Sequence, residues 1–402
     1  MPKIFPFKAI RPKQDFVDEI TGNSSDFSRT ADLVKFLEQR PENVLHLTKM
    51  HLIHPEYGQR SPEYFKHVEQ FASSLHSSDK VIEEEKEALF VYRQYINGIP
   101  HTGLLGLVDV LDYQNNTIKR HEHTRTEREK FIAELFNRTQ IFAQPVLMGH
   151  KHHKGLSSLF KSIIAELTPI LDFENSGRKH QVWRIDDSKL ITEFQEVIRS
   201  KEALYLMDGH HRVSTISRLY NKNKDEAHRY LPAFLLDDEQ LQIDPFHRLI
   251  EGGGIGEIEL LNALEPYFEI RKMVGDMHPP RMKTFCLVTN GEMYELYYKG
   301  ERDFELDVNL IEEVVLKEIF HIKDSREDQR ISFIRGDEGL EEAIDVSKRE
   351  NAHLFLLYPC KFEQICAVSD RGEVMPPKST SVEPKGRMGL IMYPYGKQEQ
   401  NR

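Results

Sequence analysis

The sequence predicts a mixed α/β protein, and three observations support this fold class. The chain has 402 residues, of which 39% are hydrophobic and 30% charged, a composition typical of folded globular proteins. In the middle third, short apolar runs alternate with amphipathic segments of helical length, which is the pattern of an α/β core. The regions on either side also mix both kinds of segment, so we expect N-terminal and C-terminal α+β parts.

The N-terminal region should begin as an extended segment, because Pro2, Pro6 and Pro12 restrict the backbone to extended or turn geometry. Apolar spacing then predicts, in order, a helix over 30–39, a strand over 44–48 and a helix over 61–75. Two runs rich in β-forming residues follow, over 88–95 and 102–111. They flank the turn signal Asn97-Gly98 and therefore predict a hairpin.

The middle and C-terminal regions continue the alternation. Helices are expected over 126–138, 156–171, 189–200, 208–220, 260–267, 308–320 and 339–348, and strands over 145–148, 182–185, 203–207, 229–236, 284–289, 293–298, 331–334, 354–357 and 388–393. The segment 251–257, EGGGIGE, interrupts the pattern with four glycines and predicts a domain boundary. We therefore expect three regions, over 1–115, 116–250 and 251–402.

Composition argues against several classes of protein. The formal charge of −11 disfavours nucleic acid as a partner. The apolar runs are far shorter than the roughly 20 residues that cross a bilayer, so we expect no contact with a membrane. Residues 1–13 lack the apolar stretch of a secretory signal, and the three cysteines form no CxxC pair, so we expect a cytoplasmic protein. The sequence has no P-loop, GxSxG or HExxH motif, which argues against Walker-type nucleotide binding and these hydrolase classes.

The most informative segment is 203–220, ALYLMDGHHRVSTISRLY. An apolar strand runs directly into a turn and then into an amphipathic helix. The first amides of such a helix have no acceptor within it, and they carry the positive end of the helix dipole, so they form a ready anion site. Gly209 allows the chain to turn and a ligand to approach closely.

Four polar side chains surround this turn. His210, His211 and Arg212 add donors for a phosphate or carboxylate. Asp208 can hold Mg²⁺ or orient a histidine. The alternative is that Asp208 only caps the helix and that the histidines lie on the surface.

A second polar cluster lies over 118–124, IKRHEHT. Glu122 stands between His121 and His123, and a carboxylate at a strand end near a phosphate site can act as a general base on a hydroxyl. In an extended chain the two histidines share a face and Glu122 lies opposite, so the three do not form a metal site. The alternative is a solvated turn in which Thr124 caps the next helix.

Three further groups are weaker candidates. His247 and Arg248 can supply phosphate donors or cap a strand. Lys378 and Ser379 belong to a basic, hydroxyl-rich strap, MPPKSTSVEPK at 375–385, which either closes over an anionic ligand or is a solvated tail. The histidine-rich tract 149–155 can bind a transition metal adventitiously, but no second set of ligands accompanies it.

Read together, several segments resemble the bacterial family of domains of unknown function numbered 1015 (DUF1015). They are PFKAIRP at 6–12, TGLLGLVDV at 102–110, IKRHEHT at 118–124, MDGHHR at 207–212, HRLI at 247–250 and MPPKST at 375–380. These segments occur in the family's order and span nearly the whole chain. The family's PYD-type segment is replaced here by GNSSDFS at 22–28, where Asp26 can substitute.

The DGHHR turn also resembles that of ParB/sulfiredoxin-like proteins, which include free-serine kinases. This resemblance implies a ParB/sulfiredoxin-like core in which residues 208–212 bind nucleotide phosphate and Mg²⁺, with Glu122 as the base and Asp208 in the catalytic site. It implies a Mg²⁺-dependent kinase that transfers phosphate from ATP or ADP to a free hydroxyl amino acid such as L-serine. The alternative is a nucleotide-binding regulatory or partner-binding protein, a ParB-like switch without phosphoryl transfer. A homodimer is left open.

Overall fold

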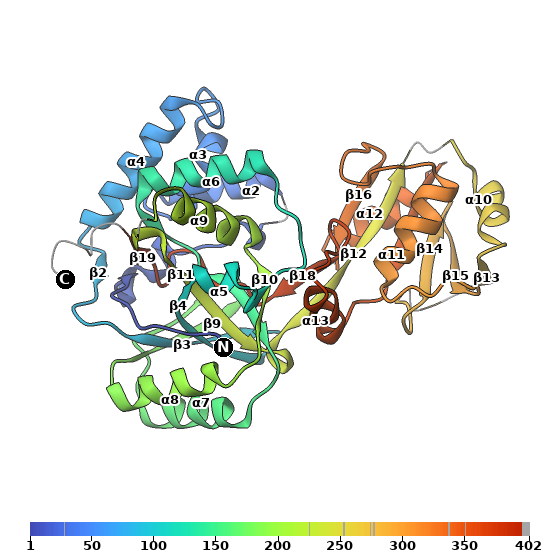
Figure 1. Ribbon diagram of the computed structural model, residues 1–402. Helices are drawn as coiled ribbons and strands as arrows, with labels where there is room; N and C mark the ends of the chain where they lie inside the picture. The colour runs from blue at the N-terminus through green and yellow to red at the C-terminus, as the bar shows by residue number, and fades with distance from the viewer. Residues whose placement is uncertain are drawn as a thin grey trace. The chain divides into compact units, whose positions relative to one another are not determined.

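The computed structural model describes residues 1–27, 29–224, 226–251, 254–273, 275, 278–336, 338–349 and 351–395. They form two compact units (Figure 1). The first comprises residues 1–241 and the chain from Pro384 onwards, and the second comprises Gln242–Glu383.

This division differs from the expected regions 1–115, 116–250 and 251–402. Strands on both sides of residue 115 hydrogen-bond within one sheet, so no boundary falls there. The second unit begins well before the glycine-rich segment 251–257, because a long strand runs up to Glu251. Gly252 and Gly253 lie outside the described residues.

The first unit is built on an eight-stranded sheet with the order β5-β10-β7-β11-β4-β3-β9-β8. Its strands are β3 (Leu89–Ile96), β4 (Ile99–Asp109), β5 (Ile118–Lys119), β7 (Val146–His150), β8 (Leu171–Asn175), β9 (Arg178–Ile185), β10 (Leu204–Asp208) and β11 (Tyr230–Asp237). The β5–β10 and β7–β11 pairs are parallel, and the other pairs are antiparallel. The predicted hairpin is confirmed: Asn97 and Gly98 have φ of 51° and 78°, the left-handed values that a two-residue type I′ turn requires.

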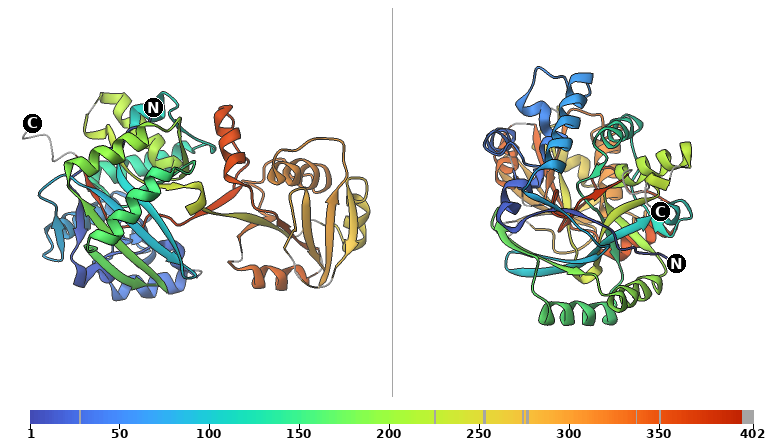
Figure 2. Two further views of the ribbon diagram at one scale, coloured as in Figure 1. Left: turned by 90° about the horizontal axis from the view of Figure 1, so that it is seen from below. Right: turned by 90° about the vertical axis from the view of Figure 1, so that its left-hand side faces the viewer.

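Helices cover both faces of this sheet (Figures 1 and 2). Helices α7 (Lys154–Glu166) and α8 (Ser188–Arg199) lie on one face, and α6 (Thr126–Thr139) and α9 (His210–Asn223) lie on the other. A helical layer continues outward from α6 through α4 (Pro62–Ser77), α3 (His46–Ile53) and α2 (Thr30–Gln39). The short helices are α1 (Val17–Ile20) and α5 (Val110–Gln114). Because the sheet is covered on both faces, its central strands are continuous apolar runs.

The predicted strand over 44–48 is wrong, because these residues lead into helix α3. Val44, Leu45 and Leu47 are buried in an apolar cluster with Leu37 of α2 and Val68 of α4. A short apolar run does not by itself distinguish a buried strand from a buried helical segment.

The C-terminal segment 384–395 belongs to the first unit. Strand β19 (Tyr393–Pro394) pairs with β6 (Ile141–Phe142), so only the end of the predicted strand over 388–393 is regular. Near it, Met392 bridges to Ile10 of β1 (Ile10–Pro12), which itself pairs with β2 (Val81–Glu83). The segment 384–395 therefore pairs with strands β1 and β6 of the first unit.

The second unit contains a sheet with the order β13-β15-β14-β17-β12-β16, and β18 pairs with β12. Its strands are β12 (Gln242–Glu251), β13 (Phe268–Lys272), β14 (Thr284–Thr289), β15 (Glu292–Tyr298), β16 (Ile331–Arg335), β17 (Ala352–Leu357) and β18 (Thr380–Glu383), and its helices are α10 (Glu257–Leu264), α11 (Asp307–Leu310), α12 (Leu340–Ser347) and α13 (Phe362–Asp370). The predicted helix over 308–320 forms as α11 followed by a π-helical segment, Ile311–Ile319. Among the described residues, no helix has both the length and the apolar character to cross a membrane.

Candidate functional site

The strand–turn–helix unit predicted from the sequence is confirmed. Strand β10 ends at Asp208, and helix α9 begins at His210. Between them Gly209 has φ of 97°, which L side chains rarely adopt. A Cβ atom there would lie 2.7 Å from Val146 Cγ1 and 2.9 Å from Arg212 Nη2. Glycine is therefore required both by the backbone conformation and by the space.

Asp208 is the carboxylate of this turn, and two cations flank it. Arg212 Nη2 donates to its Oδ2 at 2.7 Å, and Lys385 Nζ lies 3.3 Å from its Oδ1. Burial favours the neutral acid, but the charges of Lys385 and Arg212 outweigh it and lower the pKa of Asp208. Asp208 is therefore ionised at neutral pH. Lys385 comes from the basic strap, so this residue of the strap does meet the DGHHR turn.

The Arg212 guanidinium is directed into the protein. Besides Asp208, its Nη1 donates to the carbonyl oxygens of Gln144 at 2.7 Å and Pro145 at 3.1 Å. The side-chain amide of Gln144 in turn donates to the carbonyl of Gly386 at 3.0 Å. These contacts make Arg212 a positioning residue that holds the turn against the start of β7 and the C-terminal segment.

His210 is buried beside Glu122. Its Nδ1 lies 3.6 Å from Glu122 Oε2, and its ring packs edge-on against His121 with centroids 4.6 Å apart. Its Nε2 is buried and has no hydrogen-bond partner in the part of the chain that the structure describes. Burial and the neighbouring His121 hold the pKa of His210 well below its ordinary value, so the ring is neutral. Glu122 itself is half exposed, so a ligand from solvent can reach it.

His211 lies at the edge of the same turn. Its Nδ1 accepts from the backbone amide of Arg125 at 3.4 Å, and burial lowers its pKa. The structure thus brings Glu122, Asp208, Gly209, His210 and His211 together around the N-terminus of α9. Because β5 and β10 are parallel neighbours, the chain that leaves β5 passes this turn.

Sequence reasoning missed Glu129, which joins α6 to α9. Its carboxylate accepts hydrogen bonds from Thr124 Oγ1 at 2.6 Å and Ser214 Oγ at 2.5 Å, and from Arg218. Burial opposes ionisation, but these donors lower the pKa of Glu129. Thr124 therefore binds a side chain of α6, and Arg125 is the N-cap residue of that helix. The buried Ser214 of α9, a polar residue beside apolar ones, was a signal that a polar partner lies on α6.

The other four predicted phosphate-binding residues form a group in the second unit. His247 Nδ1 accepts from the amide of Leu357 at 3.1 Å. Arg248 is fully buried, 3.7 Å from Glu312, and donates to the carbonyl of Lys378 at 3.2 Å. Ser379 Oγ donates to the carbonyl of Pro376 at 2.6 Å. The structure gives these residues local partners, and their part in nucleotide binding stays a prediction.

The described residues include no group of three or more His, Cys, Asp or Glu side chains that could hold a metal ion. In the histidine-rich tract, His152 Nδ1 instead pairs with Asp237 Oδ2 at 3.0 Å. At the turn, Asp208 offers one ionised carboxylate. Mg²⁺ is commonly held by one or two carboxylates together with substrate phosphates. Asp208 would be the protein ligand of a magnesium ion that arrives with a nucleotide.

The fold is mixed α/β, and the DGHHR turn lies between the end of strand β10 and the start of helix α9. The chain belongs to the family described as "Protein of unknown function (DUF1015)", whose sequence profile matches residues 4–319. The resemblance predicted from the sequence is therefore confirmed. No curated protein matches the chain.

Several solved structures are similar to the chain at low identity. Free serine kinase in complex with AMP has a TM-score of 0.36 and 14% identity, covering 69% of this chain and 87% of that one. A mutant of free serine kinase in complex with ADP has a TM-score of 0.37 and 13% identity, with the same coverage of 69% and 87%. SbnI with a C-terminal truncation, from Staphylococcus aureus, has a TM-score of 0.39 and 14% identity over 69% of this chain and 82% of that one.

Proposed function

We propose that the protein is a Mg²⁺-dependent kinase that transfers a phosphoryl group from ATP or ADP to the hydroxyl of a free amino acid such as L-serine. One observation carries the proposal. Four features meet at one turn: an ionised aspartate, the start of a long helix, a half-exposed glutamate and a buried histidine nitrogen that has no partner among the residues the structure describes. The resemblance of the DGHHR turn to free-serine kinases supplies the type of reaction.

The nucleotide phosphates would lie at the N-terminus of α9. The backbone amides at the start of the helix and the helix dipole favour an anion there. His210 Nε2 supplies a further donor in the tautomer that carries its proton on this nitrogen. Lys385, 3.3 Å from Asp208, adds positive charge at the same place. When bound, Mg²⁺ would neutralise charge on the phosphates, with Asp208 as its protein ligand.

Glu122 is the proposed base. Its carboxylate is exposed enough to meet a substrate hydroxyl, and its Oε2 lies 3.6 Å from His210 Nδ1, beside the proposed phosphate site. In the reaction the hydroxyl oxygen forms a bond to phosphorus, the bond from phosphorus to the nucleotide oxygen breaks, and the hydroxyl proton passes to Glu122. Phosphoryl transfer relies mainly on positioning and charge neutralisation, which this cluster of groups can supply.

The test is a mass-spectrometric assay of the full-length chain with Mg²⁺, ATP or ADP and a pool of free amino acids and small hydroxyl metabolites. A phosphorylated amino acid that requires Mg²⁺ and disappears in Glu122→Gln is the expected result. Nucleotide binding without any product would contradict the kinase and favour the regulatory switch. Absence of nucleotide binding would contradict both.

A further inference from the structure

Two neighbouring residues on the central sheet of the first unit each carry a buried polar atom that has no partner among the described residues. Gln94 of β3 and His180 of β9 are direct cross-strand neighbours, and each is 1% exposed. Within the described residues, Gln94 Oε1 and His180 Nε2 have no hydrogen-bond partner. Leaving a buried polar group unsatisfied is costly. Two such atoms together indicate a place where a polar ligand binds.

The hydrogen-bonding role of each atom follows from its other contact. Gln94 Nε2 donates to the carbonyl of Lys385 at 2.7 Å, which fixes the orientation of the amide and leaves Oε1 as an acceptor. His180 Nδ1 lies 2.9 Å from the hydroxyl of Tyr92. When that hydroxyl donates to Nδ1, Nε2 carries the ring proton and is a donor. The pair then offers one acceptor and one donor to the same ligand.

The surroundings of His180 favour an anionic partner. The His180 ring stacks on Phe173, with centroids 4.9 Å apart. The guanidinium of Arg387 lies over the Phe173 ring, 5.9 Å from its centroid. Burial, together with the positive charges of Arg387 and Arg178, lowers the pKa of His180 to about 3. The ring is therefore neutral at physiological pH, and it lies in a positive potential.

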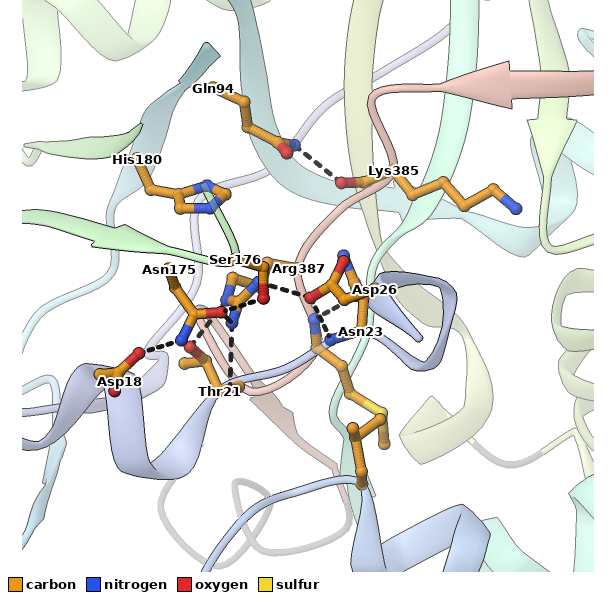
Figure 3. Close-up of polar contacts among 12 residues, drawn as sticks. Asp18, Thr21, Asn23, Asp26, Gln94, Asn175, Ser176, His180, Lys385 and Arg387 are labelled. Atoms are coloured by element: carbon orange, nitrogen blue, oxygen red, sulfur yellow. Dashed lines mark hydrogen bonds and ion pairs between the residues drawn. The ribbon is translucent and has the colours of Figure 1, made fainter. Parts of the chain in front are cut away.

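The C-terminal segment 384–390 connects this pair to the DGHHR turn. Figure 3 shows Gln94 in contact with the backbone of Lys385, whose side chain is directed away from Gln94. The far end of that side chain reaches Asp208. Two residues further along, Arg387 donates to Thr21 Oγ1 at 2.8 Å and to Asp26 Oδ2 at 3.2 Å, which fixes the segment (Figure 3). A single lysine thus spans from the Gln94–His180 pair to the proposed phosphate site.

We propose that Gln94 and His180 bind the zwitterionic head group of the acceptor, an α-amino acid, with Gln94 Oε1 accepting from its ammonium and His180 Nε2 donating to its carboxylate. This inference rests on the proposed function for the identity of the ligand as an acceptor. Facing Cβ atoms of cross-strand neighbours are about 5 Å apart, so both side chains can reach one small ligand. An amine without a carboxylate, or an acid without an ammonium, would satisfy only one of the two atoms.

The experiment measures binding to the full-length chain by calorimetry, in the presence and absence of ADP, with three hydroxyl compounds as probes: L-serine, ethanolamine and glycolate. We expect L-serine to bind at least tenfold more tightly than either of the others. Gln94→Leu and His180→Phe should each weaken L-serine binding at least tenfold and leave the Kd for ADP within twofold. His180→Phe keeps the contact between Gln94 and Lys385, so it separates ligand binding from displacement of the segment.

The matched control is Gln181→Ala, at the residue of β9 that follows His180. The Gln181 side chain lies on the opposite face of the sheet from His180, and its Nε2 donates to Asp172 Oδ2 at 2.8 Å. This variant should bind L-serine as the wild type does. Unchanged L-serine affinity in both test variants overturns the inference, even where the kinase assay yields product. Failure of the wild type to bind any probe also overturns it, because the two atoms then hold only water. L-serine binding that depends on both residues, without ADP binding, upholds this subsite and contradicts the proposed kinase.

Discussion

At the scale of the single residue, a substitution of Glu122 tests whether turnover can be lost while nucleotide binding is kept. Glu122→Gln keeps the size of the side chain and removes the base, so turnover should fall by roughly 10²–10⁴-fold. Its contact with His210 is at the rim of the turn, so the Kd for nucleotide should stay within a few fold. Initial rates from the mass-spectrometric assay and calorimetry with ADP measure the two quantities.

The control for this substitution is Glu127→Gln, which removes another exposed carboxylate close in sequence. Glu127 pairs with Lys130 of its own helix at 2.7 Å, so its loss should leave turnover unchanged. Equal losses in the two variants, or loss of nucleotide binding in Glu122→Gln, would make Glu122 structural.

Gly209 tests the geometry of the turn. Gly209→Ala should reduce the free energy of unfolding by roughly 2–5 kcal/mol, because it adds a clash with Val146 to the cost of a left-handed backbone. Gly177→Ala is the matched control: its φ is 71°, but a Cβ there meets no atom within 4 Å, so it should cost roughly 1–2 kcal/mol. Urea unfolding followed by fluorescence of Trp183 measures both, since this only tryptophan of the chain lies in the first unit. Equal costs would show that the turn has room for a side chain.

The sequence predicted the residues of the turn, because strand, glycine and helix follow one another within a few positions. It did not predict the direction of Arg212, which is fixed by the carbonyls of Gln144 and Pro145, just before strand β7. The arrival of Lys385 at Asp208 depends on a chain segment far away in sequence. Contacts of that kind leave no local pattern.

At the scale of the element, hydrogen bonds of Glu129 connect helices α6 and α9. The stability that these hydrogen bonds contribute should depend on pH. The pKa of Glu129 is lowered from 4.5 in the folded state. Its contribution to stability is therefore complete above about pH 4.5 and is lost as the pH falls through the folded pKa. Glu129→Gln should lower the free energy of unfolding by about 1.5–3 kcal/mol at pH 7, and this difference should shrink below pH 4.5.

The measurement is urea unfolding of the wild type and Glu129→Gln from pH 3 to pH 7, with Trp183 as the probe. The control is Glu134→Gln on the same helix, where the carboxylate is exposed and pairs with Arg138 at 2.8 Å. That variant should change stability by less than about 1 kcal/mol at any pH. A difference for Glu129→Gln that is independent of pH would contradict the ionised, hydrogen-bonded state of this carboxylate.

Elements with a clear period were predicted well, and those defined by partners were not. Helices over 30–39 and 126–138 correspond to α2 and α6, because their apolar spacing is helical and uninterrupted. The strand expected over 44–48 became part of a helical cluster, because an apolar run of that length has no decisive period. Strand β8 was not predicted, since its alternation is short and its pairing partner β9 determines it.

At the scale of the whole molecule, the second unit is inserted between two parts of the first. The sequence placed a boundary at the glycines, but the unit is delimited by pairing. The first and last residues of the insert, Gln242 and Glu383, are cross-strand partners on β12 and β18. Such partners have Cα atoms about 5 Å apart. The ends of the insert therefore lie close together, although a whole unit separates them in the chain.

This topology predicts that the second unit can be removed. A chain in which a short Gly-Ser linker joins Leu241 directly to Pro384 should fold, because the eight-stranded sheet and the C-terminal contacts, including Arg387 with Asp26, lie within the first unit. It should unfold in urea as cooperatively as the wild type when Trp183 is followed.

The same variant decides where the nucleotide site ends. If the site consists of Glu122, residues 208–212 and Lys385, the Kd for ADP should stay within about threefold of that of the intact chain. A large loss of affinity in a folded variant would return His247, Arg248, Lys378 and Ser379 to the site, and single alanine substitutions of these residues in the intact chain would then locate the loss. Truncation after Glu383 is the opposite control, because it removes Lys385, Arg387 and β19 together. It should abolish ADP binding and destabilise the first unit.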